Sequence, residues 1–163
     1  LPEDVEKDPS LLTVLEDIRT TAAVLMGLAS SKESAGPAVP KVCMVSAPQS
    51  YECSDGRHIE ADQIDLVART KALSVLHKAY AVTGGICTAT AALIDGTVVN
   101  EVVSDTAKQT KTVRLAHPSG QLDFDVYLTK DSDGNWDLEK AGVARTAKPI
   151  MDGFAFLPTD LFK

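Results

Sequence analysis

The segment from His77 to Thr97 constrains the fold of this 163-residue chain more than any other stretch. It runs HKAYAVTGGICTATAALIDGT, so a pair of glycines leads into a series of small and apolar residues without a charge. Such a series predicts a helix that follows Gly85 and ends near Ile94, before the helix-stopping Asp-Gly pair. Because this helix carries no charged face, we expect protein to surround it on all sides.

Thr83, Gly84 and Gly85 suggest an anion-binding turn at the start of this helix. The first N–H groups of a helix lack partners within it, and the positive end of the helix dipole favours negative charge. A carboxylate is the anion that we expect there. The alternative is that the two glycines only let the chain turn tightly into the helix. The residues alone leave both interpretations open.

Four other residues, three within this segment and one further along the chain, are candidates for a catalytic or binding role. His77 and Lys78 could transfer a proton or supply a counter-charge, although such a pair is also common at ordinary, partly exposed positions. Cys87 would have a lowered thiol pKa at a helix N-terminus, but its neighbours favour packing in the core. Ser119, in the sequence HPSG, could contact a polar ligand, or it could simply belong to a turn between two strands.

The remaining pattern predicts an α+β fold. Ser10 is the expected N-cap of a helix over 11–29, and residues 41–46 form a short buried strand. Residues 64–73 alternate as a strand does, with a helix as the alternative. Everything after the central helix favours strands, so we predict an antiparallel, barrel-like sheet wrapped around one apolar helix. The predicted strands there are 97–103, 111–116, 121–129 and 136–147, with 154–157 as a last candidate.

Composition excludes several functions. Lys and Arg number 16 against 23 Asp and Glu, which gives a net charge of −7 without a basic cluster, so we expect no nucleic-acid partner. No apolar stretch reaches the ~20 residues that span a bilayer, so we expect no membrane association and a cytoplasmic location. The three cysteines have neither disulfide nor zinc spacing, and no phosphate or dinucleotide motif is present, so no metal and no cofactor are expected. Residues 1–10 resemble a linker, and residues 11–163 form the predicted domain.

Several linked motifs resemble the PrpF-type isomerase family in order and spacing. They are LEDIRTTAAVLMGLA (15–29), VPKVCMVS (39–46), DLVARTKALSVLHKAYAVTGGICTATAAL (65–93), GTVV (96–99), HPSG (117–120) and ARTAKPIMDG (144–153). The resemblance implies one half of a fold similar to diaminopimelate epimerase, in which two pseudo-symmetric halves each wrap a sheet around a central helix. It also implies isomerisation of a C=C bond in aconitate-like unsaturated di- or tricarboxylates, without a cofactor, at a site between the halves.

The resemblance places this chain in the C-terminal half of such a protein. The family's Lys and its Cys-Gly-Asn turn, which transfer protons, belong to the N-terminal half and have no counterpart here. Thr83 corresponds to a second catalytic Cys of the epimerases, so this half is expected to bind and orient the substrate. The implied catalytic residues are Thr83 and His77, and the implied substrate-binding residues are Thr83, Gly84, Gly85, Lys78 and Ser119.

The expected partners are a small unsaturated di- or tricarboxylate, the missing N-terminal half and, in addition, a second copy in a homodimer. An alternative of a different class is a non-catalytic module that binds tricarboxylates or assists an aconitase-like enzyme.

Overall fold

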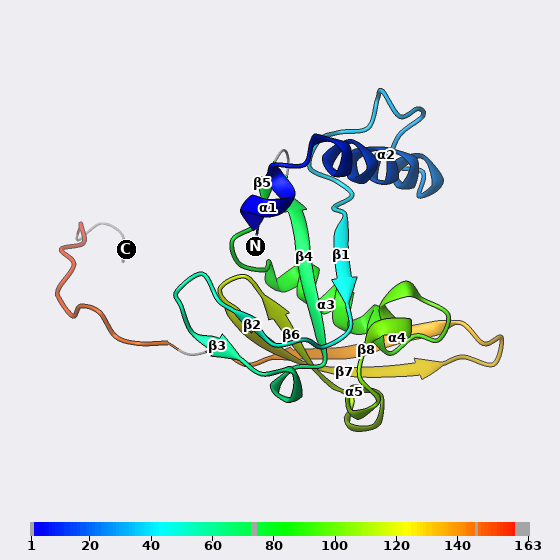
Figure 1. Ribbon diagram of the computed structural model, residues 1–163. Helices are drawn as coiled ribbons and strands as arrows, with labels where there is room; N and C mark the ends of the chain where they lie inside the picture. Colours follow the sequence, from blue (N-terminus) through cyan, green and yellow to red (C-terminus); the bar gives the residue numbers. More distant parts are fainter. Residues whose placement is uncertain (1, 73–74, 146, 159–163) are drawn as a thin grey trace.

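The protein folds around one mixed sheet, with α3 packed against a face of it (Figure 1). The computed structural model describes residues 2–72, 75–145 and 147–158. Within them the strands follow the order β1-β4-β6-β7-β8, and β5 pairs with β4. Their bounds are β1 Cys43–Ser46, β4 Leu66–Ala72, β5 Val75–Leu76, β6 Thr112–His117, β7 Gly120–Lys130 and β8 Trp136–Val143.

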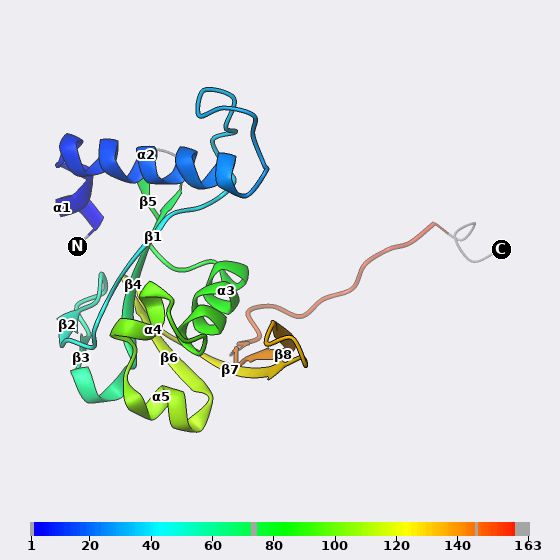
Figure 2. The same ribbon diagram turned by 90° about the vertical axis from the view of Figure 1, so that its right-hand side faces the viewer.

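The helices cover the sheet and one of its ends. In the two views α2 lies across the end of β1 and β4, while α3, α4 and α5 lie beside the strands (Figure 2). A small hairpin of β2 and β3 lies at the side of the sheet, and residues 147–158 lead away from it. The bounds are α1 Pro2–Glu6, α2 Pro9–Leu25, β2 Tyr51–Glu52, β3 His58–Ile59, a 3₁₀ turn Ala61–Gln63, α3 Val82–Ala92, α4 Val98–Val102 and α5 Asp105–Thr110.

Strand β4 is buried on both faces and joins two apolar clusters. Leu66 and Ala68 belong to the main core with α3 and Phe124, and all three named side chains are fully buried. Val67 points to the opposite face, where it packs in a smaller cluster with Ile59 of the hairpin. Apolar residues therefore lie on both faces of this strand, as is typical of a strand that is covered on both sides.

The α+β class is confirmed, but the predicted sheet differs in two respects. β4 and β6 are parallel, with Leu66 opposite Leu115, so the sheet is mixed rather than antiparallel. The connection between them holds α3, α4 and α5, and a parallel pair needs such a crossover. Within the described residues the sheet is open, and no strand pairing closes it into a barrel.

The structure corrects three further local predictions. Residues 97–103 form α4 instead of a strand, because the Thr97 hydroxyl accepts the N–H of Asn100 and caps the helix. The N-cap of α2 is Asp8 rather than Ser10, since its carboxylate accepts two backbone N–H groups. Residues 154–157 form no strand, and Phe154 is fully exposed.

The predicted linker at residues 1–10 contains secondary structure. It holds α1 and the start of α2, and the Glu6 carboxylate accepts the N–H of Leu76 in β5 at 2.9 Å. The strands predicted for 64–73 and 136–147 are confirmed as β4 and β8 over the bounds given. Leu73 and Thr146 lie outside the described residues, as do residues 159–163 of the predicted domain. No helix in the described part of the chain is long and apolar enough to cross a membrane.

Candidate functional site

The N-terminus of α3 presents unpaired backbone donors. Ala81 is the N-cap, with φ −67° and ψ 131°, and no side chain caps the helix. The first backbone bond of the helix runs from Gly85 N–H to the Ala81 carbonyl at 2.8 Å. Among the described residues, the N–H groups of Val82, Thr83 and Gly84 therefore have no hydrogen-bond partner. Three free donors at the positive end of a helix can bind a carboxylate.

The two glycines differ in their surroundings. A Cβ on Gly84 would meet only the Tyr80 ring, at an ordinary 3.7 Å, whereas a Cβ on Gly85 would lie 2.2 Å from Cζ of the buried Phe124. Gly85 therefore lets α3 approach β7, and its own N–H is already bonded to Ala81. The structure thus gives Gly85 a packing role, and the anion-binding interpretation of Thr83, Gly84 and Gly85 stays a prediction.

The expectation that protein surrounds α3 on all sides is wrong within the described residues. Gly85, Thr88, Ala89 and Ala92 face the core, but Thr83 and Cys87 are exposed. The predicted core position of Cys87 is therefore also wrong. Thr83 and Cys87 are four residues apart and lie on one side of the helix, next to the free N–H groups.

A polar contact inside the core holds the middle of α3. The Tyr80 hydroxyl lies 2.7 Å from the Cys43 sulfur in β1 and 2.9 Å from the Thr88 hydroxyl. Burial raises the pKa of Tyr80 and that of the Cys43 thiol. Both groups therefore remain protonated near neutral pH, and they act as structural hydrogen-bond partners.

His77 and Lys78 lie in the segment that leads from β5 into α3. The His77 N–H donates to the Thr70 carbonyl at 2.9 Å, and its Nδ1 accepts the Ala79 N–H at 3.3 Å. Lys78 has an exposed side chain, and its carbonyl accepts a hydrogen bond from Ser119 Oγ. Two candidates from distant parts of the chain, Lys78 and Ser119, are thus in direct contact.

The turn that carries Ser119 begins with a buried histidine. His117 is only 7% exposed, and its Nδ1 accepts the Ser119 N–H at 3.2 Å. Burial, with smaller contributions from the positive charges of Arg69 and Arg57, lowers the pKa of His117 to about 4. The imidazole is neutral at physiological pH, so Nδ1 can accept this bond.

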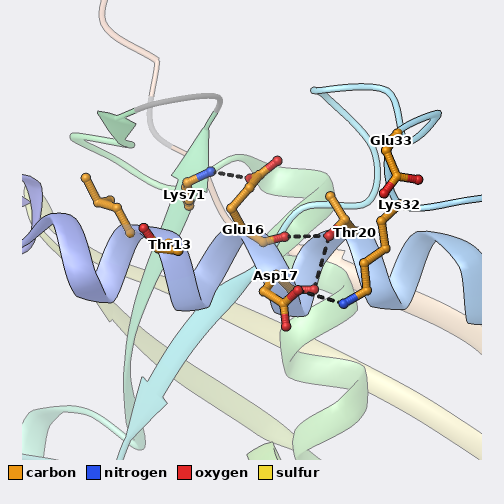
Figure 3. Close-up of a pocket in the computed structure, with 8 residues that line it drawn as sticks. Thr13, Glu16, Asp17, Thr20, Lys32, Glu33 and Lys71 are labelled. Carbon is orange, nitrogen blue, oxygen red and sulfur yellow. Dashed lines mark hydrogen bonds and ion pairs between the residues drawn. The ribbon is translucent and has the colours of Figure 1, made fainter.

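A separate hollow of about 580 Å³ lies along α2 and contains none of the predicted site residues. Two ion pairs cross its lining: Glu16 bonds Lys71 at 2.6 Å, and Lys32 bonds Asp17 at 2.6 Å (Figure 3). Arg19, which does not line the hollow, bonds Glu16 at 2.7 Å. The hydrogen bonds from Arg19 and then Lys71 lower the pKa of Glu16 to about 2. We assign these contacts to the attachment of α2 to β4.

Comparisons with known proteins agree with this fold. The family model described as PrpF protein matches residues 1–158. The chain is 39% identical over 160 residues to a protein of Eubacterium barkeri named 3-methylitaconate isomerase, and 34% identical to the 2-methyl-aconitate isomerase of Shewanella oneidensis. These alignments cover 96% and 97% of this chain but 40% of each relative.

A solved structure of an isomerase is similar to this chain in fold and in sequence. The crystal structure of methylitaconate-delta-isomerase superposes with a TM-score of 0.73 at 33% identity, over 88% of this chain and 39% of that one. The relatives and the solved structure named here are isomerases. This chain belongs to the PrpF family. It spans about 40% of the length of the curated relatives that it matches.

Two residues next to the candidate site could not be predicted from the sequence. Tyr51 and Arg57 of the β2–β3 hairpin bond the backbone of the turn at Ser119, more than 60 residues later in the chain. Residues 47–61 show no periodicity that would have indicated a hairpin, and contacts with backbone carbonyls leave no motif. The only signal was the presence of Tyr and Arg in a segment otherwise typical of a loop.

Proposed function

We propose that this chain is the carboxylate-binding part of an isomerase that shifts the C=C bond of an unsaturated di- or tricarboxylate by proton transfer. The observation that carries the proposal is the 39% identity to 3-methylitaconate isomerase over nearly the whole chain, together with the uncapped N-terminus of α3. The relatives' names favour an isomerase over the alternative of a non-catalytic accessory module.

The substrate carboxylate accepts hydrogen bonds from the N–H groups of Val82, Thr83 and Gly84, and the Thr83 hydroxyl adds a fourth donor beside them. Bonds to a charged acceptor are about twice as strong as neutral ones, so this cradle suits a carboxylate. Gly85 acts through packing, because it lets α3 sit against Phe124. The exposed face of α3 that holds Thr83 and Cys87 then faces the substrate or the rest of the protein.

The reaction is an allylic 1,3-proton shift. A base removes the proton from the carbon next to a carboxylate, the electron pair delocalises into that carboxylate and the C=C bond, and an acid returns a proton at the far carbon. The free N–H groups of α3 stabilise the negative charge that develops on the carboxylate. A Thr hydroxyl is a weak carbon base, so Thr83 orients the substrate while a group outside this chain removes the proton from carbon.

His77, Lys78 and Ser119 complete the proposed site. Lys78 provides an exposed ammonium group for a second carboxylate, and His77 Nε2 is the ring nitrogen that remains for a proton transfer. Ser119 holds the segment that carries both of them, through the Lys78 carbonyl. The partners are the remaining part of the isomerase and, in addition, a second copy of it. We retain the barrel-like closure of the sheet around α3 as a proposal for the complete protein.

Deuterium exchange tests the division of labour. The complete protein in D₂O should incorporate deuterium into an unsaturated tricarboxylate such as aconitate, as followed by proton NMR, whereas this chain alone should not. Exchange catalysed by the folded chain alone would refute the assignment of proton transfer to the rest of the protein. Binding of tricarboxylates without any turnover by the complete protein would support the accessory module instead.

The N–H cradle is tested by Val82→Pro in the complete protein. Proline is tolerated at the first helical position and removes one donor, and the extended backbone of Ala81 suits a residue before proline. Val82→Ala keeps the N–H and controls for the lost side chain. We expect KM to rise about tenfold for Val82→Pro relative to Val82→Ala, the loss of one charge-assisted hydrogen bond. Equal KM values would exclude this N–H group as a ligand.

A further inference from the structure

The β2–β3 hairpin and β4 supply donors to every carbonyl of the turn from Ala116 to Gly120. The Tyr51 hydroxyl lies 2.9 Å from the His117 carbonyl and 2.7 Å from that of Gly120, so its proton is shared between the two ends of the turn. Three other donors complete the series: Arg69 Nη1 to Ala116 at 3.2 Å, Ser54 N–H to Pro118 at 2.8 Å and Arg57 Nη2 to Ser119 at 3.1 Å.

The turn depends on a glycine at its last residue. Gly120 has φ +143°, a value that residues with a side chain rarely adopt. A Cβ on Gly120 would lie only 3.3 Å from Arg57 Nη2, which is a close contact. The hairpin therefore packs closely on the turn as well as bonding to it.

The turn also forms a hydrogen bond with the segment that leads into α3. Ser119 Oγ donates to the Lys78 carbonyl, and Lys78 lies three residues before the N-cap Ala81. The Ser119 N–H donates to His117 Nδ1, so the N–H, the carbonyl and the hydroxyl of Ser119 all have defined partners. Hydrogen bonds thus connect the Tyr51 hydroxyl, through the turn, to the Lys78 carbonyl in the segment that leads into α3.

We infer that Tyr51 and Arg57 are positioning residues of the carboxylate site: they fix the turn so that Ser119 orients Lys78 and the free N–H groups of α3. This inference rests on the proposed function for its kinetic consequence. The contacts themselves join two parts of the chain that share no secondary structure, since the β2–β3 pair forms its own sheet.

The kinetic test is Tyr51→Phe in the complete protein, a change that removes only the shared hydroxyl. Tyr127→Phe is the matched control, because Tyr127 is 51% exposed on β7 and its hydroxyl has no hydrogen bond in the described part of the chain. Ser104→Ala controls for stability, since it removes a bond to the buried Asp65, which among the described residues also bonds Arg114 of β6 but no residue of the turn. We expect Tyr51→Phe to raise KM about fivefold, the loss of one neutral hydrogen bond, and both controls to leave KM unchanged.

Arg57 offers a rescue experiment. Arg57→Ala should raise KM as Tyr51→Phe does. Arg57→Lys keeps a donor of similar reach, so its KM should lie close to the wild-type value. A lowered melting temperature without a change in KM in Tyr51→Phe would show a merely structural role and overturn the inference. An equal rise of KM in Ser104→Ala would overturn it too.

Hydrogen–deuterium exchange by mass spectrometry tests the positioning without activity. In Tyr51→Phe we expect faster exchange of backbone amides in residues 77–84 as well as in the turn, and the wild-type rate in Tyr127→Phe. Faster exchange confined to the turn would show that loss of the Tyr51 hydroxyl does not affect residues 77–84, and it would refute the inference. If the wild-type complete protein isomerises no unsaturated carboxylate, the proposed function fails, while the exchange comparison still decides whether the hairpin positions α3.

Discussion

Gly85→Ala tests whether the second glycine of the pair serves packing or binding. The added Cβ would lie 2.2 Å from Phe124 Cζ, 2.8 Å from Cε2 and 2.9 Å from Cε1, against ordinary contacts of 3.4 Å or more. Cζ lies on the axis of ring rotation, so a ring flip cannot relieve the contact. The ring is fully buried, and α3 or β7 must move by about 1 Å in a close-packed core.

The magnitude follows from two opposing effects. Overpacking of this kind costs about 1–3 kcal/mol, while alanine is favoured over glycine inside a helix by about 1 kcal/mol. We therefore expect Gly85→Ala to lower the free energy of unfolding by up to about 2 kcal/mol. Gly84→Ala is the matched control on the same helix, where the new Cβ meets only the Tyr80 ring at 3.7 Å. We expect it to leave stability unchanged or to raise it slightly.

Urea unfolding of the chain, followed by circular dichroism, measures both variants. A double-mutant cycle with Phe124→Leu identifies the contact, because a shorter side chain leaves room for the Cβ and should cancel the cost of Gly85→Ala. Equal stability of Gly84→Ala and Gly85→Ala would refute the packing role. A cost of Gly85→Ala that persists beside Leu at position 124 would place the clash elsewhere.

Three further predictions concern buried charge, pH and thiol exposure. Asp65→Asn should lower the free energy of unfolding by about 2–3 kcal/mol in urea titrations, because the buried carboxylate bonds Arg114 at 2.9 Å; an effect below 1 kcal/mol would contradict this. Since the folded-state pKa of His117 is about 4, below its unfolded value, the unfolded chain binds one more proton between about pH 4 and 6.5. The contribution of His117 to the free energy of unfolding should be fully present above about pH 6.5 and should be lost as the pH falls towards 4. His117→Asn should remove this contribution, and an unchanged dependence of the unfolding free energy on pH would contradict the prediction. Cys87 should react quickly with a maleimide in the native chain while Cys53, 3% exposed, should not, and equal labelling rates would contradict the exposed face of α3.

The elements that the sequence predicts well are those whose local pattern and tertiary surroundings agree. The long helix α2, the central helix α3 and the hairpin of β6 and β7 follow from periodicity and turn residues. The valines at 98–99 and 102–103 favoured a strand by their branching. Thr97 nevertheless caps a helix there, and Asn100 donates to the Ala92 carbonyl at 2.8 Å. Contacts to the end of α3 decide that segment, and propensity cannot report them.

The chain's own residues predict a helix after two glycines, although α3 begins at Val82 and includes both of them. The order of the motifs indicates the family. The residues alone leave open that Gly85 serves packing, because that depends on Phe124, about 40 residues later in the chain. They also cannot indicate that Tyr51 holds the turn at Ser119. Local patterns record the geometry of one element, whereas the site depends on backbone carbonyls and ring edges from several elements. Those groups meet only when the sheet and α3 pack together, so only the tertiary structure assigns their roles.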